Sequence, residues 1–274
     1  MNLDTAIADR YREDRSVQAL ADHWIFSNIK PGCHLLQDPP ELAYDQICEL
    51  YEMVSSSLKD FEPLNLAIWE AFFGVYKGMP DDMIIYLIVG APEPYDAFVR
   101  FHDGKNAAIF DLYRFSTYSQ NPADLVSIVR NLITHEFSHI RIHENHLEPP
   151  HDAPIEQVLR HILFNEGIAH FLAYDRDVSS VDWDTEDLLE KKRKAYSSLR
   201  HEFSTCSASN REDVLIRATS GKFWDKFAAV SGLFAVADYY VQHQKNLESL
   251  TQLYLQGPDL LWDFWEESSS ALPS

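Results

Sequence analysis

The pattern of apolar and polar positions divides the chain into a helical N-terminal stretch, a short strand-rich stretch and a long helical C-terminal stretch. In the first stretch, apolar residues recur every three to four positions, which is typical of helices that bury one face. This spacing predicts helices within residues 4 to about 28, 41 to about 60 and 63 to about 78. The short proline clusters along the chain do not form linkers between domains.

The strand-rich stretch consists of three short apolar runs at residues 83–89, 97–102 and 107–113. The first run is almost uniformly apolar, and the third alternates apolar and polar residues, as a half-buried strand does. Asp103 and Gly104 between the second and third runs are a turn signal, because this pair favours the tight turn of a hairpin. We therefore predict a small antiparallel sheet.

Helical spacing returns after Pro122 and continues toward the C-terminus. It predicts helices at about 122–144, 154–174, 184–203, 210–219, 221–244 and 246–255. Helices, then a compact sheet, then many helices indicate an α+β protein that is mostly α. We expect a single domain at 1–267, followed by a disordered tail at 268–274. Its expected parts are a helical N-terminal part (1–80), the sheet with the next two helices (81–176) and a helical C-terminal part (177–267).

Charge and composition exclude several functional classes. The 274 residues include 23 Lys and Arg against 43 Asp and Glu, a net charge of −20, whereas binding to nucleic acids or anionic membranes requires a basic surface. Hydrophobic residues make up 46% of the chain, which is enough for a packed core. Three cysteines without a CxxC pair are typical of a reducing compartment. Because the N-terminus has no signal-peptide pattern and the apolar runs are too short to span a bilayer, we expect a cytoplasmic protein without nucleic-acid or membrane partners.

The feature with the clearest chemistry is His135-Glu136-Phe137-Ser138-His139, an HExxH motif inside the predicted helix at 122–144. Four residues advance a helix by about 6 Å and about 40° net, so the two imidazoles can converge on one ion. Glu136 projects from nearly the same side, where it can accept a proton from metal-bound water. The motif therefore predicts a catalytic metal site with two histidine ligands and a glutamate base.

The position of the motif on its helix supports this interpretation. On a helical wheel, the two histidines and the glutamate fall within or beside the apolar stripe that points toward the core. That stripe is formed by Leu125, Val129, Leu132 and Ile140. Buried imidazoles and carboxylates are unfavourable unless they are paired or bound to a metal. The alternatives are a hydrogen-bonded polar network in the core and a solvated helix face.

A hydrolytic zinc site usually has a third protein ligand and one open position. Glu166 is the strongest candidate, because it lies among apolar residues on the next predicted helix and therefore needs a partner. His143 lies about 12 Å along the helix axis from His135, so both cannot bind one ion, and it is expected to support a ligand or to pack. His146 and His151, in a proline-rich loop, remain alternative ligands.

The letters HEFSH, followed on another helix by NEGIA, resemble the gluzincin zinc peptidases, the clan of thermolysin-like and aminopeptidase-like enzymes. The NEGxA form is closer to the aminopeptidase branch and to small zinc-dependent proteases than to thermolysin. The resemblance covers about residues 130–175. It implies a zincin-like fold with the sheet packed on the HExxH helix, a peptide bound at a sheet edge, and Zn²⁺ as cofactor. It also implies His135, His139 and Glu166 as metal ligands and Glu136 as general base.

The chain departs from the thermolysin-like pattern four residues after Glu166. That pattern has an acid there, which orients a ligand histidine, whereas this chain has His170. The orienting group is therefore open among Asp152, Asp175 and a backbone carbonyl. An exopeptidase loop of the GAMEN kind is not recognisable, so the resemblance does not extend to aminopeptidase activity.

Zinc peptidases often use a tyrosine or histidine to hydrogen-bond the developing oxyanion. The predicted helix at 221–244 offers Tyr240 and His243 as candidates for this catalytic role. Gly232 on the same helix would allow a close approach to the metal-bearing helices. The alternative for the tyrosine is packing with its hydroxyl at the surface.

Taken together, the motifs favour a zinc metallopeptidase, a hydrolase whose partner is a peptide or protein substrate. Two alternatives remain, namely a zinc hydrolase of a non-peptide amide or ester and an inactive zincin-like binding module. Glu136 argues against the binding module, because a structural metal site requires only the ligands.

Overall fold

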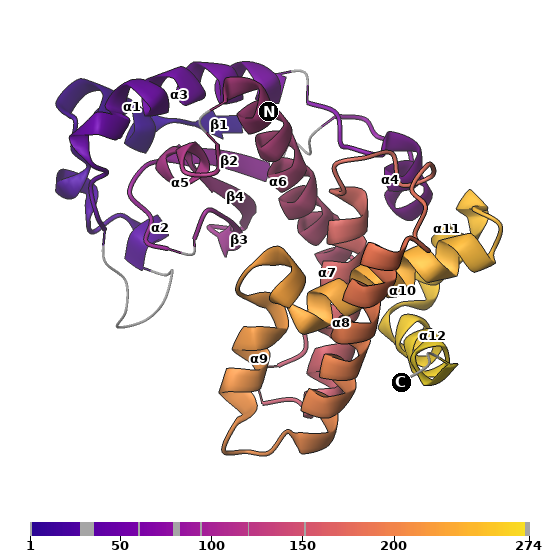
Figure 1. Cartoon of the computed structure of the whole chain (residues 1–274). Coiled ribbons are helices and arrows are strands. Elements are labelled where there is room, and N and C mark those ends of the chain that lie inside the picture. The colour runs from indigo at the N-terminus through magenta and orange to yellow at the C-terminus, as the bar shows by residue number, and fades with distance from the viewer. Residues whose placement is uncertain are drawn as a thin grey trace. The chain divides into compact units, whose positions relative to one another are not determined.

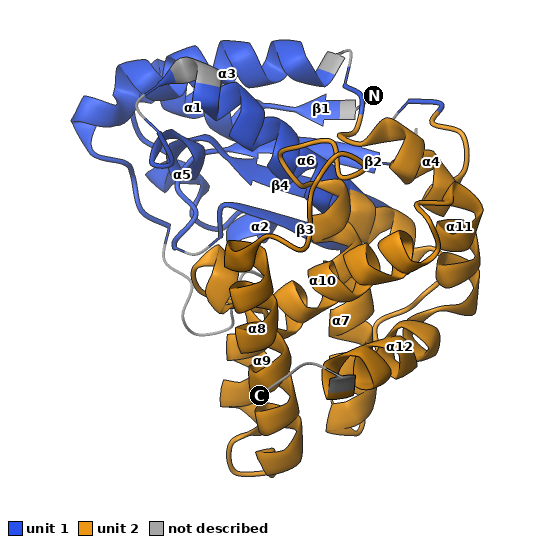
Figure 2. Ribbon diagram, turned by 45° about the vertical axis from the view of Figure 1, so that its right-hand side comes forward, with its two compact units in different colours: residues 1–62, 77–137 blue, residues 63–76, 138–274 orange. Residues whose placement is uncertain are grey.

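The computed structural model describes residues 2–27, 36–59, 61–78, 83–93, 95–119, 121–150 and 152–271. They form an α+β structure in which helices predominate, as the sequence predicts. The chain divides into two compact units, residues 1–62 with 77–137 (unit 1) and residues 63–76 with 138–274 (unit 2) (Figure 2). The sequence predicts one domain with three consecutive parts, and this organisation stays a prediction.

Unit 1 contains a sheet with the strand order β1-β2-β4-β3. The strands are β1 (Asn2–Asp4), β2 (Met83–Ile88), β3 (Ala97–His102) and β4 (Lys105–Asp111). β3 and β4 form an antiparallel hairpin, but β4 also pairs with β2 in parallel, and β2 pairs with β1 in parallel. The sheet is therefore mixed, and the prediction of an antiparallel sheet is correct only for the hairpin.

The burial of the strands explains the parallel pairings. All residues from Ala107 to Asp111 in β4 are buried, and β2 is buried at four of its six positions. Strands that are buried on both faces are typical of parallel pairing, whereas the edge strand β3 is half-buried or exposed throughout. The predicted turn is confirmed, because Asp103 and Gly104 join the hairpin with φ angles of 49° and 77°.

Among its described residues, unit 1 also contains three short helices and one longer helix. They are α1 (Ala6–Asp14), α2 (Trp24–Ser27), α3 (Tyr44–Lys59) and α5 (Leu112–Ser116). α1 packs on β2 and on α3. Arg15 adopts a left-handed conformation with φ of 58° and ends α1, so the helical segment predicted for residues 4 to about 28 is interrupted.

The helix α6 (Pro122–His143) carries the HExxH motif and is continuous over 22 residues. Leu125, Val129 and Ile140 on its predicted apolar stripe are buried. Residues of α6 up to Phe137 belong to unit 1, and those from Ser138 belong to unit 2.

Unit 2 is built from helices. They are α4 (Leu66–Phe73), α7 (Ile155–Leu172), α8 (Glu186–Thr205), α9 (Arg211–Thr219), α10 (Phe227–Gln242), α11 (Leu247–Gln256) and α12 (Pro258–Ala271). Thirteen of the sixteen residues of α10 are buried. α7, α8, α9 and α12 all pack against α10, which is therefore the core helix of this unit (Figure 1).

The C-terminal end of unit 2 differs from the sequence prediction. The helix α12 was not predicted, and it extends to Ala271, so residues 268–271 of the expected disordered tail are helical. Ser269 is buried in it. Residues 272–274 lie outside the described residues. Among the helices of the described segments, none combines the length and the apolar character needed to cross a membrane.

α7 and α10 touch through their backbones at Gly167 and Gly232. A Cβ atom on Gly232 would lie 2.0 Å from the carbonyl oxygen of Leu163 and 2.8 Å from the Cα atom of Gly167. These distances exclude any side chain at this position. The close approach predicted for Gly232 is confirmed, and it packs α7, which carries Glu166, directly against the core helix.

Candidate metal centre

α6 presents the motif residues from one continuous helix. His135 and His139 are separated by one helical turn, about 6 Å along the axis. Glu136 and His139 are buried, with 7% and 8% of their surface exposed, and His135 is half-buried. His135 and Glu136 lie in the portion of α6 that belongs to unit 1, and His139 lies in unit 2. The predicted core-facing orientation is thus confirmed for Glu136 and His139.

In unit 2, α7 brings Glu166 to His139. Glu166 Oε1 lies 3.8 Å from His139 Nε2, and Glu166 Oε2 lies 3.5 Å from Nε2 of His170, one turn further along α7. The carboxylate thus has an imidazole nitrogen beside each of its oxygens. The structure therefore brings Glu166 and His139 together from separate helices. Their role as ligands stays a prediction.

Asn65 fixes the C-terminal end of α7. Its side-chain Nδ2 donates to the carbonyl oxygens of Leu172 at 3.0 Å and Tyr174 at 3.3 Å, and its Oδ1 accepts from the Val178 amide at 3.0 Å. These bonds satisfy carbonyl groups that a helix end leaves without intrahelical partners. Together with the glycine contact, they hold the helix that carries Glu166 in one position.

Asn165 is the group that orients His139. Its Oδ1 lies 3.0 Å from His139 Nδ1, and because an amide oxygen can only accept, Nδ1 must donate its proton to it. The second ring nitrogen, Nε2, then carries a lone pair on the side of Glu166. Asp152 and Asp175, proposed from the sequence for this role, are both exposed. The sequence prediction is therefore corrected for His139, whose described partner is a side-chain amide.

His170 occupies the position of the acid in the thermolysin-like pattern. Burial, with smaller electrostatic contributions from Lys226 and His139, lowers its pKa well below 6.5. His170 is therefore neutral near pH 7. A neutral imidazole beside a carboxylate can donate one N–H or offer one lone pair, so His170 can orient Glu166 or bind a cation with it.

A further group of metal-ligating residues lies wholly within unit 2. His143, Glu148 and His161 each offer a ligand atom, and these atoms all lie within 4.8 Å of one another. Burial, with smaller contributions from the nearby His143, His139 and His146, lowers the pKa of His161 to about 4. The described residues thus include partly buried groups of histidine and glutamate that could hold a metal ion. Sequence reasoning missed this group, because its members come from a helix end, a loop and the next helix.

His146 has a packing role in the structure. Its Nε2 lies 2.8 Å from the carbonyl oxygen of Tyr254, to which it donates, and its ring packs against the rings of Phe164 and Tyr254. A Cβ atom on Gly257 would lie 3.0 Å from the ring. One ring nitrogen of His146 is therefore engaged away from Glu166. His151, the other alternative ligand, lies outside the described residues.

Tyr240 and His243 lie toward the C-terminal end of α10. The Tyr240 ring packs against Phe171 at 5.9 Å between centroids, and Nδ1 of His243 lies 2.8 Å from the Tyr239 carbonyl oxygen. Gly232 marks the point of α10 that touches Gly167, and His243 is eleven residues further, which is about 16 Å along a helix. These contacts do not bring either residue to Glu166, and their role at an oxyanion stays a prediction.

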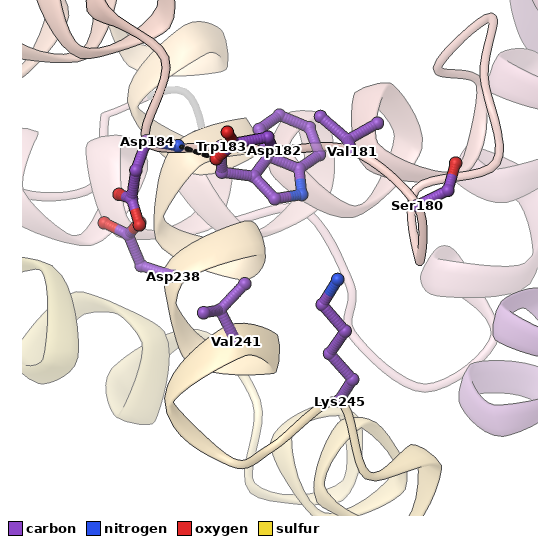
Figure 3. Close-up of a pocket in the computed structure, with 8 residues that line it drawn as sticks. All are labelled: Ser180, Val181, Asp182, Trp183, Asp184, Asp238, Val241 and Lys245. Atoms are coloured by element: carbon purple, nitrogen blue, oxygen red, sulfur yellow. Dashed lines mark hydrogen bonds between the residues drawn. The ribbon is translucent and has the colours of Figure 1, made fainter.

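Unit 2 also contains a pocket that the sequence did not reveal, with a volume of about 310 Å³ (Figure 3). It is lined by Ser180, Val181, Asp182, Trp183, Asp184, Asp238, Val241 and Lys245. Figure 3 shows the carboxylates of Asp184 and Asp238 turned toward each other, with Lys245 at a distance from both. The pocket shares no residue with the histidine and glutamate groups described above.

The geometry leaves room for a metal ion between α6 and α7 in unit 2. Zinc bonds to nitrogen and oxygen are about 2.1 Å long, so two of them can span up to about 4.2 Å. The 3.8 Å between His139 Nε2 and Glu166 Oε1 falls within that limit. Comparisons of the chain with protein-family models, with curated proteins and with solved structures find no match, so the chemistry of these residues is the basis for any functional conclusion.

Proposed function

We propose that this chain is a zinc-dependent hydrolase that cleaves peptide bonds, with a zincin-like fold and a gluzincin-type site. His135, His139 and Glu166 hold the metal, and Glu136 is the general base. The observation that carries the proposal is the 3.8 Å approach of Glu166 Oε1 to His139 Nε2. It joins a carboxylate from a second helix to the second histidine of the HExxH motif, which is the ligand combination that hydrolytic zinc sites use.

The hydrogen bond from His139 to Asn165 supports the proposal. It fixes the tautomer in which Nε2 can bind a metal, and a partner on the other ring nitrogen is a regular feature of metal-bound histidines. His135 precedes His139 by one turn of the same helix, as the HExxH geometry requires. The donor set of two imidazoles and one carboxylate fits Zn²⁺ and leaves a position for substrate or water.

The metal and Glu136 have different roles in the proposed hydrolysis. Bound Zn²⁺ supplies a Lewis acid that polarises the scissile carbonyl and lowers the pKa of water. Glu136 accepts a proton from the attacking water and delivers it to the leaving amine. Its burial keeps bulk water away from this proton transfer. The net charge of −20 weakly favours neutral or basic peptides through electrostatic steering.

The substitution Glu136→Gln tests this proposal, because it removes the base while keeping the size of the side chain. We expect peptide hydrolysis to fall by about 10²- to 10⁴-fold, the usual contribution of a positioned general base. Zinc content should stay at that of the wild type, because Glu136 is not a ligand. Cleavage of a mixed peptide library and zinc content are measured on the same samples, with Glu144→Gln on the exposed surface as control.

Two outcomes would contradict the proposal. Cleavage that survives in a zinc-loaded Glu136→Gln variant would show that Glu136 is not the base. A wild type that holds zinc but cleaves no peptide would overturn the proposed peptidase activity. In that case, a panel of small amides and esters separates a hydrolase of another substrate from an inactive binding module.

A further inference from the structure

The histidines of unit 2 continue beyond the proposed zinc site toward the loop after α6. His143 is the last residue of α6, Glu148 lies in the loop that follows, and His161 lies in the second turn of α7. Their ligand atoms lie within 4.8 Å of one another. Around one ion with bonds of about 2.1 Å, ligand atoms lie at most about 4.2 Å apart, so only a small closure is needed. The exposed loop residue Glu148 can supply that movement.

His161 gives this cluster an observation that points to a ligand. The residue is 94% buried, because only 6% of its surface is exposed. Its Nε2 is buried and has no hydrogen-bond partner within the described part of the chain. A buried polar atom without a partner is unfavourable. A cation bound at this nitrogen would remove that cost.

The neighbours of the cluster can accommodate an ion. The rings of His143 and His161 stack at 6.0 Å between centroids, with only 12° between their planes. Asn165 Nδ2 donates to His143 Nε2 over 3.4 Å, which is longer than a normal N–H hydrogen bond. An ion at His143 would therefore displace only a weak contact. Glu148 is exposed to solvent and supplies the negative charge and an entry route.

One ion cannot serve both this cluster and the HExxH motif. His143 follows His135 by eight residues, about 12 Å along α6, so the two histidines cannot share a metal. Asn165 lies between the two groups, because its Oδ1 contacts His139 and its Nδ2 contacts His143. The two sites are therefore separate but adjacent.

We propose that His143, Glu148 and His161 form a second site for a divalent transition-metal ion, next to the proposed zinc site. Two imidazoles and one carboxylate suit Zn²⁺, and they also bind Co²⁺ and Ni²⁺. The proposal does not depend on the hydrolase function, because its three ligands differ from those of the HExxH site.

Cobalt binding to the full-length chain tests the second site. The metal-free protein is dialysed against buffered Co²⁺, and bound cobalt per chain is measured by elemental analysis. We expect two equivalents for the wild type and one for Glu148→Ala, which changes an exposed side chain and should leave the fold intact. Glu144→Ala, in the same region and also exposed, is the matched control and should keep two equivalents.

Two more variants distinguish the sites. His161→Ala should also bind one equivalent, with its fold checked by circular dichroism, and His139→Ala should lose the other equivalent. Two equivalents in both Glu148→Ala and His161→Ala would overturn the second site. A wild type that binds no cobalt would also overturn it. So would a wild type that binds one equivalent, if His139→Ala abolishes that binding. One wild-type equivalent that is lost in Glu148→Ala and kept in His139→Ala would support the second site and contradict the proposed function.

Discussion

Unit 2 contains two partly buried carboxylates with very different neighbours. Asp238 on α10 accepts hydrogen bonds from the Lys192 ammonium at 2.9 and 3.1 Å and from the Tyr196 hydroxyl at 3.2 Å. Burial raises the pKa of Asp238, and the ammonium of Lys192 counteracts that shift. Glu166 on α7 has imidazole nitrogens of His139 and His170 beside its two oxygens, at 3.8 and 3.5 Å.

The two carboxylates differ in the chemical type of the neighbours that the structure describes for them. The chain itself supplies the cation for Asp238, because Lys192 is buried beside it. The groups around Glu166 include imidazoles that offer lone pairs, and burial holds the pKa of His170 well below 6.5. A carboxylate paired with an ammonium is complete as a structural ion pair, whereas a carboxylate with imidazole nitrogens beside it offers a set of donors that suits a metal. Chemical surroundings, more than burial, therefore separate a structural acid from a candidate ligand.

The largest expected effect is on stability at the ion pair. Lys192→Met should destabilise the protein by about 3–5 kcal/mol, because it leaves the Asp238 carboxylate buried without its cation. Urea unfolding measures this loss. Lys194→Met on the same helix is the control, because its pair with Asp225 is exposed on both sides and should contribute little to stability. Equal effects of the two substitutions would show that the buried pair of Lys192 and Asp238 is not a special structural ion pair.

The next effect is on metal affinity at Glu166. Glu166→Gln should weaken zinc binding at least 10- to 100-fold, since loss of a group that only supports a ligand already has that effect. Asp238→Asn should leave zinc affinity unchanged. Competition with a chromophoric chelator gives the dissociation constants of both variants. If His146→Ala weakens zinc binding and Glu166→Gln does not, the gluzincin ligand set is wrong.

The smallest expected effect is on the pH dependence of stability, and it concerns the imidazole of His161. The pKa of His161 is about 4 in the folded chain and about 6.5 when unfolded, so the unfolded state binds more protons between these values. Stability from this group is therefore present above pH 6.5 and is lost as pH falls toward 4. In the metal-free protein, His161→Gln should reduce the loss of stability between pH 6.5 and 5.5 by about 1 kcal/mol. Urea unfolding at the two pH values checks this, and an unchanged loss would show that His161 is not held neutral by burial.

The sequence was sufficient to predict those parts of the site that depend on local pattern. The HExxH spacing and the apolar stripe placed Glu136 and His139 on one helix, because helical periodicity is encoded over a few turns. Glu166 could be singled out because an acid among apolar residues needs a partner. Gly232 could be linked to close helix packing because a residue without a side chain in a strongly apolar helix permits such contact.

The remaining features depend on which segments meet in the folded chain. Asn165 on α7 contacts His139 on α6, and local sequence patterns do not predict a contact between two helices. In the sequence, the motif draws attention to Glu166, the residue next to Asn165. The parallel pairing of β2 with β4 needs a crossover that apolar runs do not specify, and β1 has only three residues, too few for periodicity. The cluster of His143, Glu148 and His161 has no regular spacing, so no motif search would find it.

The contact of Gly167 with Gly232 also determines the direction in which the face of α7 that carries Glu166 points. Neighbouring residues on a helix differ in direction by about 100°, so Glu166 keeps a constant angle to the surface that Gly167 presses on α10. With no side chains between the two backbones, α7 cannot turn about its own axis without a collision. A single methyl group at Gly232 would therefore act at a distance, by rotating or displacing the helix and turning the Glu166 carboxylate away from His139. The orientation of the Glu166 carboxylate is thus determined by Gly167 and Gly232, two residues that have no functional groups.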